Sequence, residues 1–184
     1  MNANETLFQG PYDSLDLAAP INVIDFGSLQ IPPDSRYALR VDVEEGTDRI
    51  IALTIDIEST SLQLQAFAAP KTETIWHEVA NDLIESLRAQ GVQAESAIGP
   101  FGSEVLTHGV PGDDRPLRFI GFDGPRWFLR GTISGKALGD RDAALVIENV
   151  FRSIVVNRGA DPVPPRSLLE ISMPAGAIAP GLRS

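Results

Sequence analysis

The residues best suited to chemistry lie in one predicted hairpin, residues 117–134. It gathers three arginines and two aromatic residues, namely Arg118, Arg126, Trp127, Phe128 and Arg130. In an alternating strand, Arg126, Phe128 and Arg130 share one face. Guanidinium groups bind carboxylates through paired hydrogen bonds and stack on aromatic rings. The hairpin is therefore predicted to contact an anionic ligand or an acidic partner, and the alternative is a ladder of ion pairs that balances the acidic strands at 40–58.

Only two side chains, His77 and His108, have an ordinary pKa near neutrality. His77 belongs to the polar face of a predicted helix, where an ordinary solvent-exposed residue is the alternative to a catalytic role. His108 ends a predicted strand, and a polar strand-edge residue is the alternative to a catalytic role. Two histidines so far apart in sequence do not define a hydrolase or a metal site. No catalytic residue is therefore predicted.

Two further patterns resemble ligand sites without matching them. An acidic turn could hold a hard cation loosely, but its spacing is not that of the twelve-residue calcium loop, and a solvated turn is favoured; its residues are Asp42, Glu44, Glu45 and Asp48. The segment 131–137 has three residues between its glycines instead of the four of a phosphate loop, and Ala137 has no hydroxyl for magnesium. Neither a cofactor nor a metal site is predicted.

The elements that position the hairpin follow from hydrophobic periodicity. Alternating apolar and polar residues predict strands at 21–31, 37–43, 50–58 and 61–69. Apolar residues at helical spacing then predict an amphipathic helix that begins after an N-cap at Thr72 and ends at Gly91. Further strands are expected at 92–97, 104–108, 117–122 and 127–134. Asp140 or Asp142 is expected to cap a shorter helix that runs into 154–156.

This order of elements predicts an α+β fold. We expect an antiparallel sheet of about seven strands, flanked by one long and one short helix, with extended N- and C-terminal arms. Residues 1–20 are expected to form a flexible arm, of which 1–9 resemble the remnant of an expression vector. Residues 21–158 are expected to form a single domain, and 159–184 a proline-rich tail that either wraps this domain or waits for a partner.

Net charge and composition limit the partners. The 184-residue chain has a net charge of −10 and no cysteine. A protein that binds phosphate groups needs a concentrated positive field, so no nucleic acid is expected. The chain has no apolar run of membrane-spanning length and no recognisable secretory signal, so no membrane contact and a cytoplasmic location are expected.

Several strings together resemble an uncharacterised actinobacterial protein family, known only as a domain of unknown function. They are Gly10-Pro11-Tyr12-Asp13, LQLQAFAAP (62–70), Gly99-Pro100-Phe101-Gly102, RFIGFDGPRWFLRG (118–131) and FRSIVVNRG (151–159). The resemblance covers the chain from Gly10 to about Arg166. It implies no activity and therefore carries over no catalytic residue. The order of strands and helices is also similar to Mog1/PsbP-like folds, many of which are accessory or binding proteins.

Two functions from different classes remain open. The first is a non-catalytic interaction or accessory protein that binds a protein partner or forms a homo-oligomer, favoured because no catalytic constellation was found. The alternative is a binder of small anionic ligands, or an enzyme, that uses the hairpin at 118–131.

Overall fold

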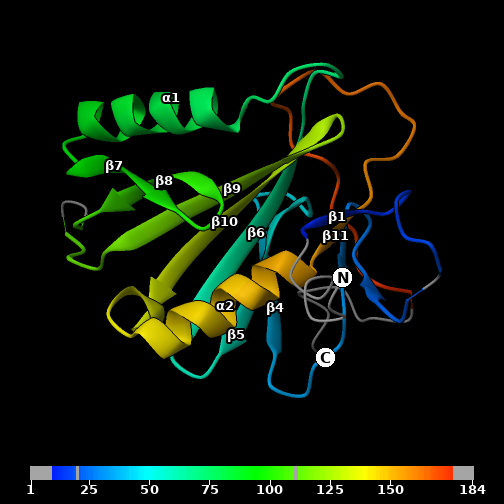
Figure 1. Ribbon diagram of the computed structural model, residues 1–184, viewed down its shortest axis with the longest axis horizontal. Coiled ribbons are helices and arrows are strands. Elements are labelled where there is room, and N and C mark those ends of the chain that lie inside the picture. The colour runs from blue at the N-terminus through cyan, green and yellow to red at the C-terminus, as the bar shows by residue number, and fades with distance from the viewer. Residues whose placement is uncertain (1–9, 20, 110–111, 176–184) are drawn as a thin grey trace, which may run out of the picture.

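A seven-stranded antiparallel sheet forms the centre of the molecule (Figure 1). The structure is a computed structural model that describes residues 10–19, 21–109 and 112–175. The sheet has the strand order β4-β5-β6-β10-β9-β8-β7. Its strands are β4 (Ala38–Val43), β5 (Ile50–Ile57), β6 (Thr60–Ala68), β7 (Ala94–Gly99), β8 (Gly102–Thr107), β9 (Leu117–Gly124) and β10 (Trp127–Gly135). The predicted fold class and the sheet of seven strands are confirmed.

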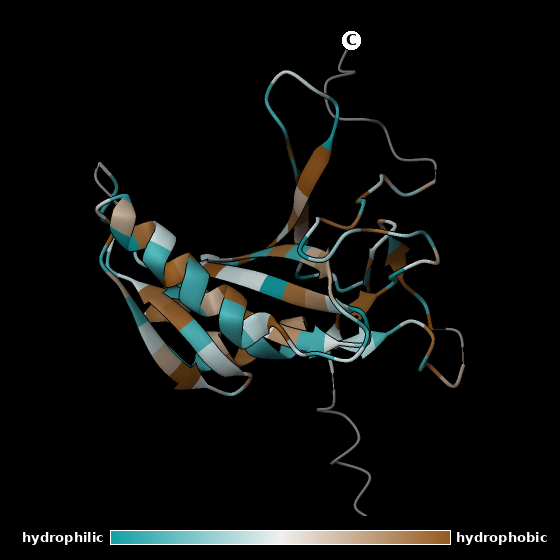
Figure 2. Ribbon diagram, turned by 90° about the horizontal axis from the view of Figure 1, so that it is seen from above, coloured by the Kyte–Doolittle hydropathy of each residue, from teal (hydrophilic) through white to brown (hydrophobic). Residues whose placement is uncertain are grey.

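Two helices pack on opposite faces of this sheet. The helix α1 (Trp76–Ala89) lies on β7, β8 and β9, whereas α2 (Arg141–Ser153) crosses the other face near β6 (Figure 1). A short 3₁₀ turn, η2 (Lys136–Leu138), links β10 to α2. Figure 2 shows both hydrophilic and hydrophobic bands along the ribbon of α1, as expected for a helix that is buried on one side only. The second helix has the predicted extent of 13 residues, whereas α1, at 14 residues, is shorter than expected because it begins at Trp76 and not after Thr72.

The two helices differ in how their N-termini are capped. Asp140 caps α2 as predicted, because its carboxylate accepts a hydrogen bond from the Ala143 N–H at 3.0 Å. The prediction of Thr72 as the cap of α1 is wrong. That helix begins at Trp76, after Ile75, and the carboxylate of Asp123 on β9 accepts hydrogen bonds from both of their backbone N–H groups at 3.0 Å. The cap of α1 is thus a tertiary contact.

A second, smaller sheet was not expected from the sequence. It has the order β1-β11-β3-β2, formed by β1 (Tyr12–Asp13), β2 (Ile24–Asp25), β3 (Leu29–Ile31) and β11 (Val155–Val156). The stretch predicted as one strand, 21–31, is instead a hairpin. It turns at Gly27, whose positive φ of 83° suits glycine and whose N–H donates to the Asp25 carboxylate at 2.9 Å.

The described part of the C-terminal segment lies against its own domain. Its residues 166–171 occupy the gap where β5 and β6 diverge, with β-bridges from Leu168 to Phe67 and from Ile171 to Ile50 and Gly27. Arg166 also forms ion pairs with Glu78 and Asp82 of α1, at 3.0 and 2.7 Å. The segment therefore ties the large sheet, the small sheet and α1 together. The predicted vector remnant, residues 1–9, falls outside the described residues.

The apolar core has two parts, one on each face of the large sheet. The larger cluster fills the space between the sheet, α2 and the small sheet, and it includes Leu29, Leu53, Ile133 and Phe151. The smaller cluster lies under α1 and includes Trp76, Val105 and Phe128. Because α1 covers only β7 to β9, no helix covers that face of β4, β5, β6 and β10 within the described residues.

Candidate functional site

Strand register divides the predicted arginines between the two faces of the sheet. In the β9–β10 pair, Arg118 lies opposite Ile133, and Arg130 lies opposite Gly121. Side chains alternate along a strand, so residues at even positions of β9 face α2 and those at odd positions face α1. Arg118 therefore points toward α2, and Arg130 points to the opposite side. The hairpin does not bring these two arginines into one site.

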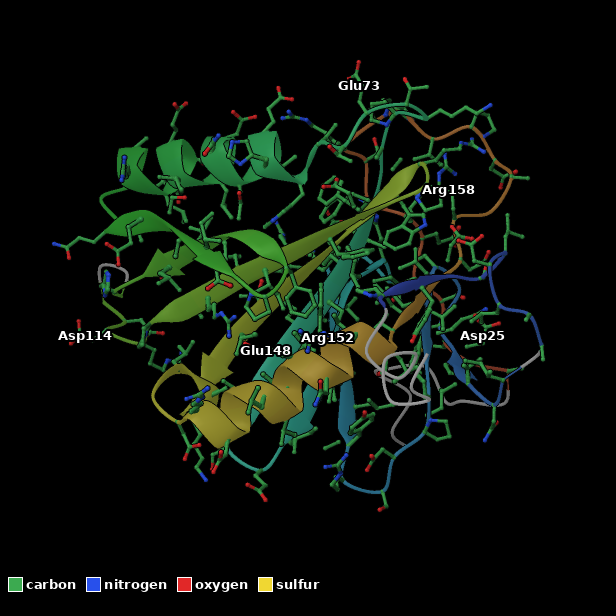
Figure 3. The ribbon with its side chains drawn as sticks, viewed as in Figure 1. Asp25, Glu73, Asp114, Glu148, Arg152 and Arg158 are labelled. Atoms are coloured by element: carbon green, nitrogen blue, oxygen red, sulfur yellow. The ribbon has the colours of Figure 1, made fainter. Side chains whose placement is uncertain are left out.

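Arg118 is the centre of a buried ion-pair cluster. Its Nη2 lies 2.9 Å from Glu104 Oε2, and its Nη1 lies 2.8 Å from Glu148 Oε1 of α2. Burial by itself would lower the pKa of Arg118, but the hydrogen bonds that it donates to the two carboxylates outweigh this effect, and the pKa is raised. Figure 3 labels Glu148 on α2, facing the sheet. With both carboxylates paired to it, Arg118 fastens α2 to β8 and β9. It forms ion pairs, but with Glu104 and Glu148 and not with the acidic strands at 40–58.

Trp127 and Phe128 are core residues, each only 1% exposed. The indole N–H of Trp127 donates to Asp13 Oδ2 at 2.6 Å, which fixes the N-terminal segment on the hairpin. The ring of Phe128 stacks on Phe67 with a centroid separation of 4.9 Å. Neither ring is available to a partner in solution, because tertiary packing has used both faces.

Arg126 lies in the turn between β9 and β10 rather than on the strand. Trp127 pairs with Gly124, so Pro125 and Arg126 form a two-residue turn. Arg126 has a positive φ of 65°, which is uncommon for a residue other than glycine. Its carbonyl accepts hydrogen bonds from Ala69 N–H at 2.8 Å and from Arg158 Nε at 3.2 Å, and its side chain is exposed.

Arg130 is the unusual cation of the hairpin. Its guanidinium lies over the Phe67 ring, 5.1 Å from the centroid, and its Nη2 donates to the side-chain oxygen of Gln65. Its Nε is buried and has no hydrogen-bond partner within the described residues. No carboxylate of the described chain forms an ion pair with it, and burial lowers its pKa. A mostly buried, uncompensated charge lowers stability, so another reason for this residue is required.

Arg130 belongs to a polar surface on the side of the sheet that α1 leaves open. We call this surface the polar face. It consists of side chains from β4, β5, β6 and β10 that register places on one side: Arg40, Asp42, Thr54, Asp56, Ser61, Gln63, Gln65, Arg130 and Thr132. Its two arginines and two aspartates sum to zero charge, whereas the whole chain carries −10. The polar face is thus locally neutral on an acidic protein.

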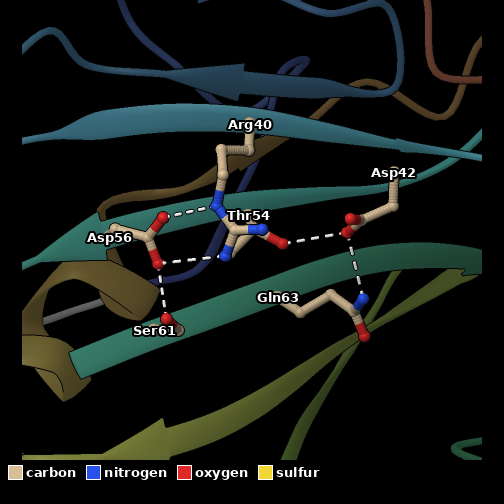
Figure 4. A network of polar contacts seen from close by, with 6 residues as sticks. All are labelled: Arg40, Asp42, Thr54, Asp56, Ser61 and Gln63. Carbon is tan, nitrogen blue, oxygen red and sulfur yellow. Dashed lines mark hydrogen bonds and ion pairs between the residues drawn. The ribbon is translucent and has the colours of Figure 1, made fainter. Parts of the chain in front are cut away.

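All the other charges of the polar face are engaged (Figure 4). Arg40 forms a two-pronged contact with Asp56, at 2.5 and 3.2 Å, and Ser61 donates to the same carboxylate. The hydrogen bond from Arg40 is the main reason that the pKa of Asp56 is lowered. Asp42 accepts hydrogen bonds from Thr54 at 3.0 Å and Gln63 at 3.1 Å. Among these four charged residues, Arg130 is therefore the one with a buried nitrogen that has no hydrogen-bond partner within the described residues.

Hydrogen bonds hold Gln65 in position beside Arg130. Its amide nitrogen donates to the Ile51 carbonyl at 2.9 Å while its oxygen accepts from Arg130. The sequence contained the signal for this pair, since Gln63, Gln65 and Phe67 alternate with buried residues in the segment predicted as a strand. Their role was missed because only the pairing of β6 with β10 places them next to Arg130.

The histidines do not form a catalytic arrangement. His77 Nδ1 lies 2.7 Å from Ser103 Oγ, and its Nε2 lies 3.4 Å from the Asn81 amide nitrogen. If Asn81 donates to Nε2, the proton resides on Nδ1 and points at Ser103, the reverse of what a general base needs. His108 is bound instead to Glu95, at 2.9 Å. Within the described residues, no group of three or more His, Asp or Glu side chains is placed to hold a metal ion.

Comparisons with known proteins add a family but no activity. A family model described as a protein of unknown function, DUF3710, matches residues 10–179. No curated protein and no solved structure matches the chain. Among the described residues, no helix combines the length and the hydrophobicity needed to cross a membrane.

Proposed function

The chain belongs to the DUF3710 family of proteins of unknown function, and from that starting point we propose that it is a non-catalytic, cytoplasmic interaction protein. The polar face is the binding surface, and Arg130 is its anchor. The partner is a protein that places an aspartate or glutamate carboxylate on this guanidinium. The single observation that carries the proposal is a mostly buried arginine without an anion.

Charge complementarity selects the partner. Arg130 lacks a counter-charge, while Arg40, Asp42 and Asp56 already have partners in the sheet. A carboxylate bound at Arg130 would supply the counter-charge that Arg40 already has in Asp56. A nucleic acid would bring many phosphates to a chain of net charge −10, which long-range repulsion disfavours.

The geometry also supports binding without large rearrangement. Gln65 and the Phe67 ring hold the guanidinium in one orientation, so little side-chain entropy is lost when a carboxylate binds. The Nη1 atom makes no hydrogen bond within the described residues and is not among the buried unpaired atoms, so it can receive the carboxylate. Flanking hydroxyl and amide groups, such as Thr132 and Gln63, then form the polar rim of the interface.

The test combines stability and binding in one pair of variants. In Arg130→Met, the side-chain stem is kept and the charge is removed, so we expect the free energy of unfolding to be equal to or above that of the wild type. We also expect a peptide with one glutamate among four glutamines, with both termini blocked, to shift the NMR signals of Arg130 Nε–H, Gln65 and Phe67 in the wild-type protein, and to have no such effect in Arg130→Met. A pentaglutamine peptide is the matched control.

Arg141→Gln is the control, because this exposed arginine of α2 lies on the opposite side of the sheet from the polar face and its loss should leave peptide binding unchanged. A clear loss of stability in Arg130→Met, or an absence of peptide-induced shifts at Arg130, contradicts the proposal. Sedimentation equilibrium tests whether a second copy of this chain binds the polar face. Self-association that disappears in Arg130→Met would assign the polar face to a second copy instead of a different protein.

A further inference from the structure

A separate cavity of about 450 Å³ lies at the turn between β9 and β10. Three segments that are far apart in sequence form its walls: the N-terminal segment after β1, the β9–β10 turn and the residues that follow β11. The side chains that matter for its chemistry are Leu15, Asp16, Pro125, Arg126, Asn157 and Arg158. Its volume is within the range of small-molecule sites.

Two arginines line this cavity without a carboxylate partner in the described part of the chain. Arg158 is held by neutral groups: its Nε donates to the Arg126 carbonyl at 3.2 Å, and its Nη1 donates to the Asp161 carbonyl at 2.9 Å. Its Nη2 makes no hydrogen bond to a described residue. Figure 3 shows Arg158 beside the β9–β10 turn. The guanidinium is thus positioned with its charge uncompensated.

The second arginine, Arg126, occupies a backbone conformation that favours glycine. A φ of 65° costs a side-chain-bearing residue free energy relative to glycine. Its side chain makes no hydrogen bond or ion pair with a described residue. A strained turn that keeps an arginine where glycine fits better points to a role for the guanidinium itself.

Part of the cavity wall is apolar. Leu15 is 90% exposed, the most exposed large apolar residue of the described chain, and Pro125 is exposed beside it. The aliphatic stems of the two arginines extend this surface. An exposed leucine near two guanidinium groups that have no carboxylate partner among the described residues suits a ligand with one charged end and an apolar body.

The acidic residues of the cavity limit the charge of that ligand. Asp13 is 6% exposed and already accepts hydrogen bonds from Trp127 Nε1 and Leu15 N–H. Asp16 leaves an exposed carboxylate on the rim. Asp16 opposes any negative charge beyond the one that the guanidinium groups bind, and inorganic phosphate has no apolar body to cover Leu15 and Pro125, whereas an alkyl carboxylate has both a charged head and an apolar chain.

We propose that this cavity binds a small amphiphilic carboxylate, with its head group between Arg126 and Arg158 and its alkyl chain on Leu15 and Pro125. The site is independent of Arg130 and the polar face, which lie away from the turn. It requires no covalent step.

Octanoate is the probe, titrated into the full chain and followed by calorimetry and by NMR shifts at Leu15, Asn157 and Gly159. We expect saturable binding of octanoate, with octanol and inorganic phosphate weaker by roughly tenfold or more, because octanol lacks the charged hydrogen bonds and phosphate lacks the alkyl chain. Arg126→Gly, which suits the turn, should weaken binding by roughly tenfold without loss of stability. Leu15→Gln should weaken octanoate binding less than Arg126→Gly does, because it removes only the apolar contact with the alkyl chain.

Two control variants separate this site from other effects. Arg141→Gln removes an exposed arginine of α2, and Arg130→Met removes the anchor of the polar face; both should bind octanoate as the wild type does. Unchanged binding in Arg126→Gly, or no NMR shifts around the cavity at millimolar octanoate, would overturn the proposal. Binding of a peptide with a free apolar C-terminus in place of octanoate would also overturn it, since the ligand would then be a protein terminus.

Discussion

Arg118 and Arg130 lie on the same hairpin but on opposite faces of the sheet, and only Arg118 has carboxylate partners. One guanidinium bridges Glu104 and Glu148 in the interior, and the other is stacked on Phe67 with its Nε unsatisfied. Identical side chains in the same two strands therefore have different roles. The first stabilises the fold, and the second lowers stability unless something binds it.

The same substitution should therefore have opposite effects at the two positions. Arg118→Met leaves Glu104 and Glu148 buried without a cation, and we expect the free energy of unfolding to fall by about 3–5 kcal/mol. Arg130→Met removes an uncompensated charge and should not lower it. Urea unfolding at pH 7 measures both values, and equal losses at the two positions would refute this assignment.

The triple variant that replaces all three buried charges provides the control. Arg118→Met with Glu104→Leu and Glu148→Leu removes the unpaired carboxylates as well as the arginine. We expect most of the loss of the single variant to be recovered, because well-packed apolar residues often replace a buried ion-pair cluster without penalty. Failure to recover would assign the loss to packing rather than to unpaired charge.

Gly121 is required by the indole of Trp76. A Cβ at this position would lie 2.0 Å from Trp76 Cδ2, so Gly121→Ala must displace the first residue of α1. We expect a loss of about 1–3 kcal/mol in the free energy of unfolding and a shift in tryptophan fluorescence. Gly139→Ala is the matched control, because nothing lies within 4 Å of its added Cβ, and its stability should be unchanged or higher by up to about 1 kcal/mol.

Asp123 should matter for α1 although it belongs to β9. Its carboxylate caps the backbone N–H groups of Ile75 and Trp76, so Asp123→Ala is expected to cost about 0.5–2 kcal/mol. Asp123→Asn keeps the accepting oxygen and should retain most of this stability. Hydrogen exchange at the first turn of α1 should rise in the alanine variant only, and equal exchange in all three proteins would contradict the cap.

The Arg40–Asp56 pair should produce a stability difference that depends on pH. The pKa of Asp56 is lowered in the folded chain, so the pair contributes above the ordinary value of 3.8 and is lost as pH falls through the folded pKa. Because Arg40 is exposed, Arg40→Gln should cost only about 0.2–1 kcal/mol at pH 6. The difference between the two proteins should shrink as pH falls through the folded pKa of Asp56 and vanish once Asp56 is protonated in both proteins. A carboxyl NMR titration that leaves the pKa of Asp56 unchanged in the variant would exclude the contact.

Much of the fold could be predicted because it depends on local patterns. The strands of the large sheet follow from alternation, as in residues 61–69, where every second side chain is buried in β6. Asp140 acts within three residues of itself, so its cap was visible in sequence. The helix α1 was predicted from the spacing of residues such as Trp76, Ala80 and Ile84, all of which are buried.

The contacts that define the candidate sites are not local. Alternation placed Arg130 on one side of its strand. It could not show that β6 would supply Gln65 and Phe67 as the neighbours of this guanidinium, or that no carboxylate of the described residues would form an ion pair with it. It also could not show that Glu148, thirty residues after Arg118, would reach it from α2, or that Arg158 would meet Arg126 at the turn.

The sequence by itself therefore determined the two helices, the strands of the large sheet and the side of each that is apolar, because backbone geometry repeats every two residues in a strand and every 3.6 in a helix. Only the tertiary structure decided which charges are neutralised. Electrostatic compensation depends on distances of a few ångströms between side chains far apart in sequence. For this protein that difference separates Arg118, which pairs with Glu104 and Glu148, from Arg126, Arg130 and Arg158, which have no carboxylate partner among the described residues and for which we propose binding roles.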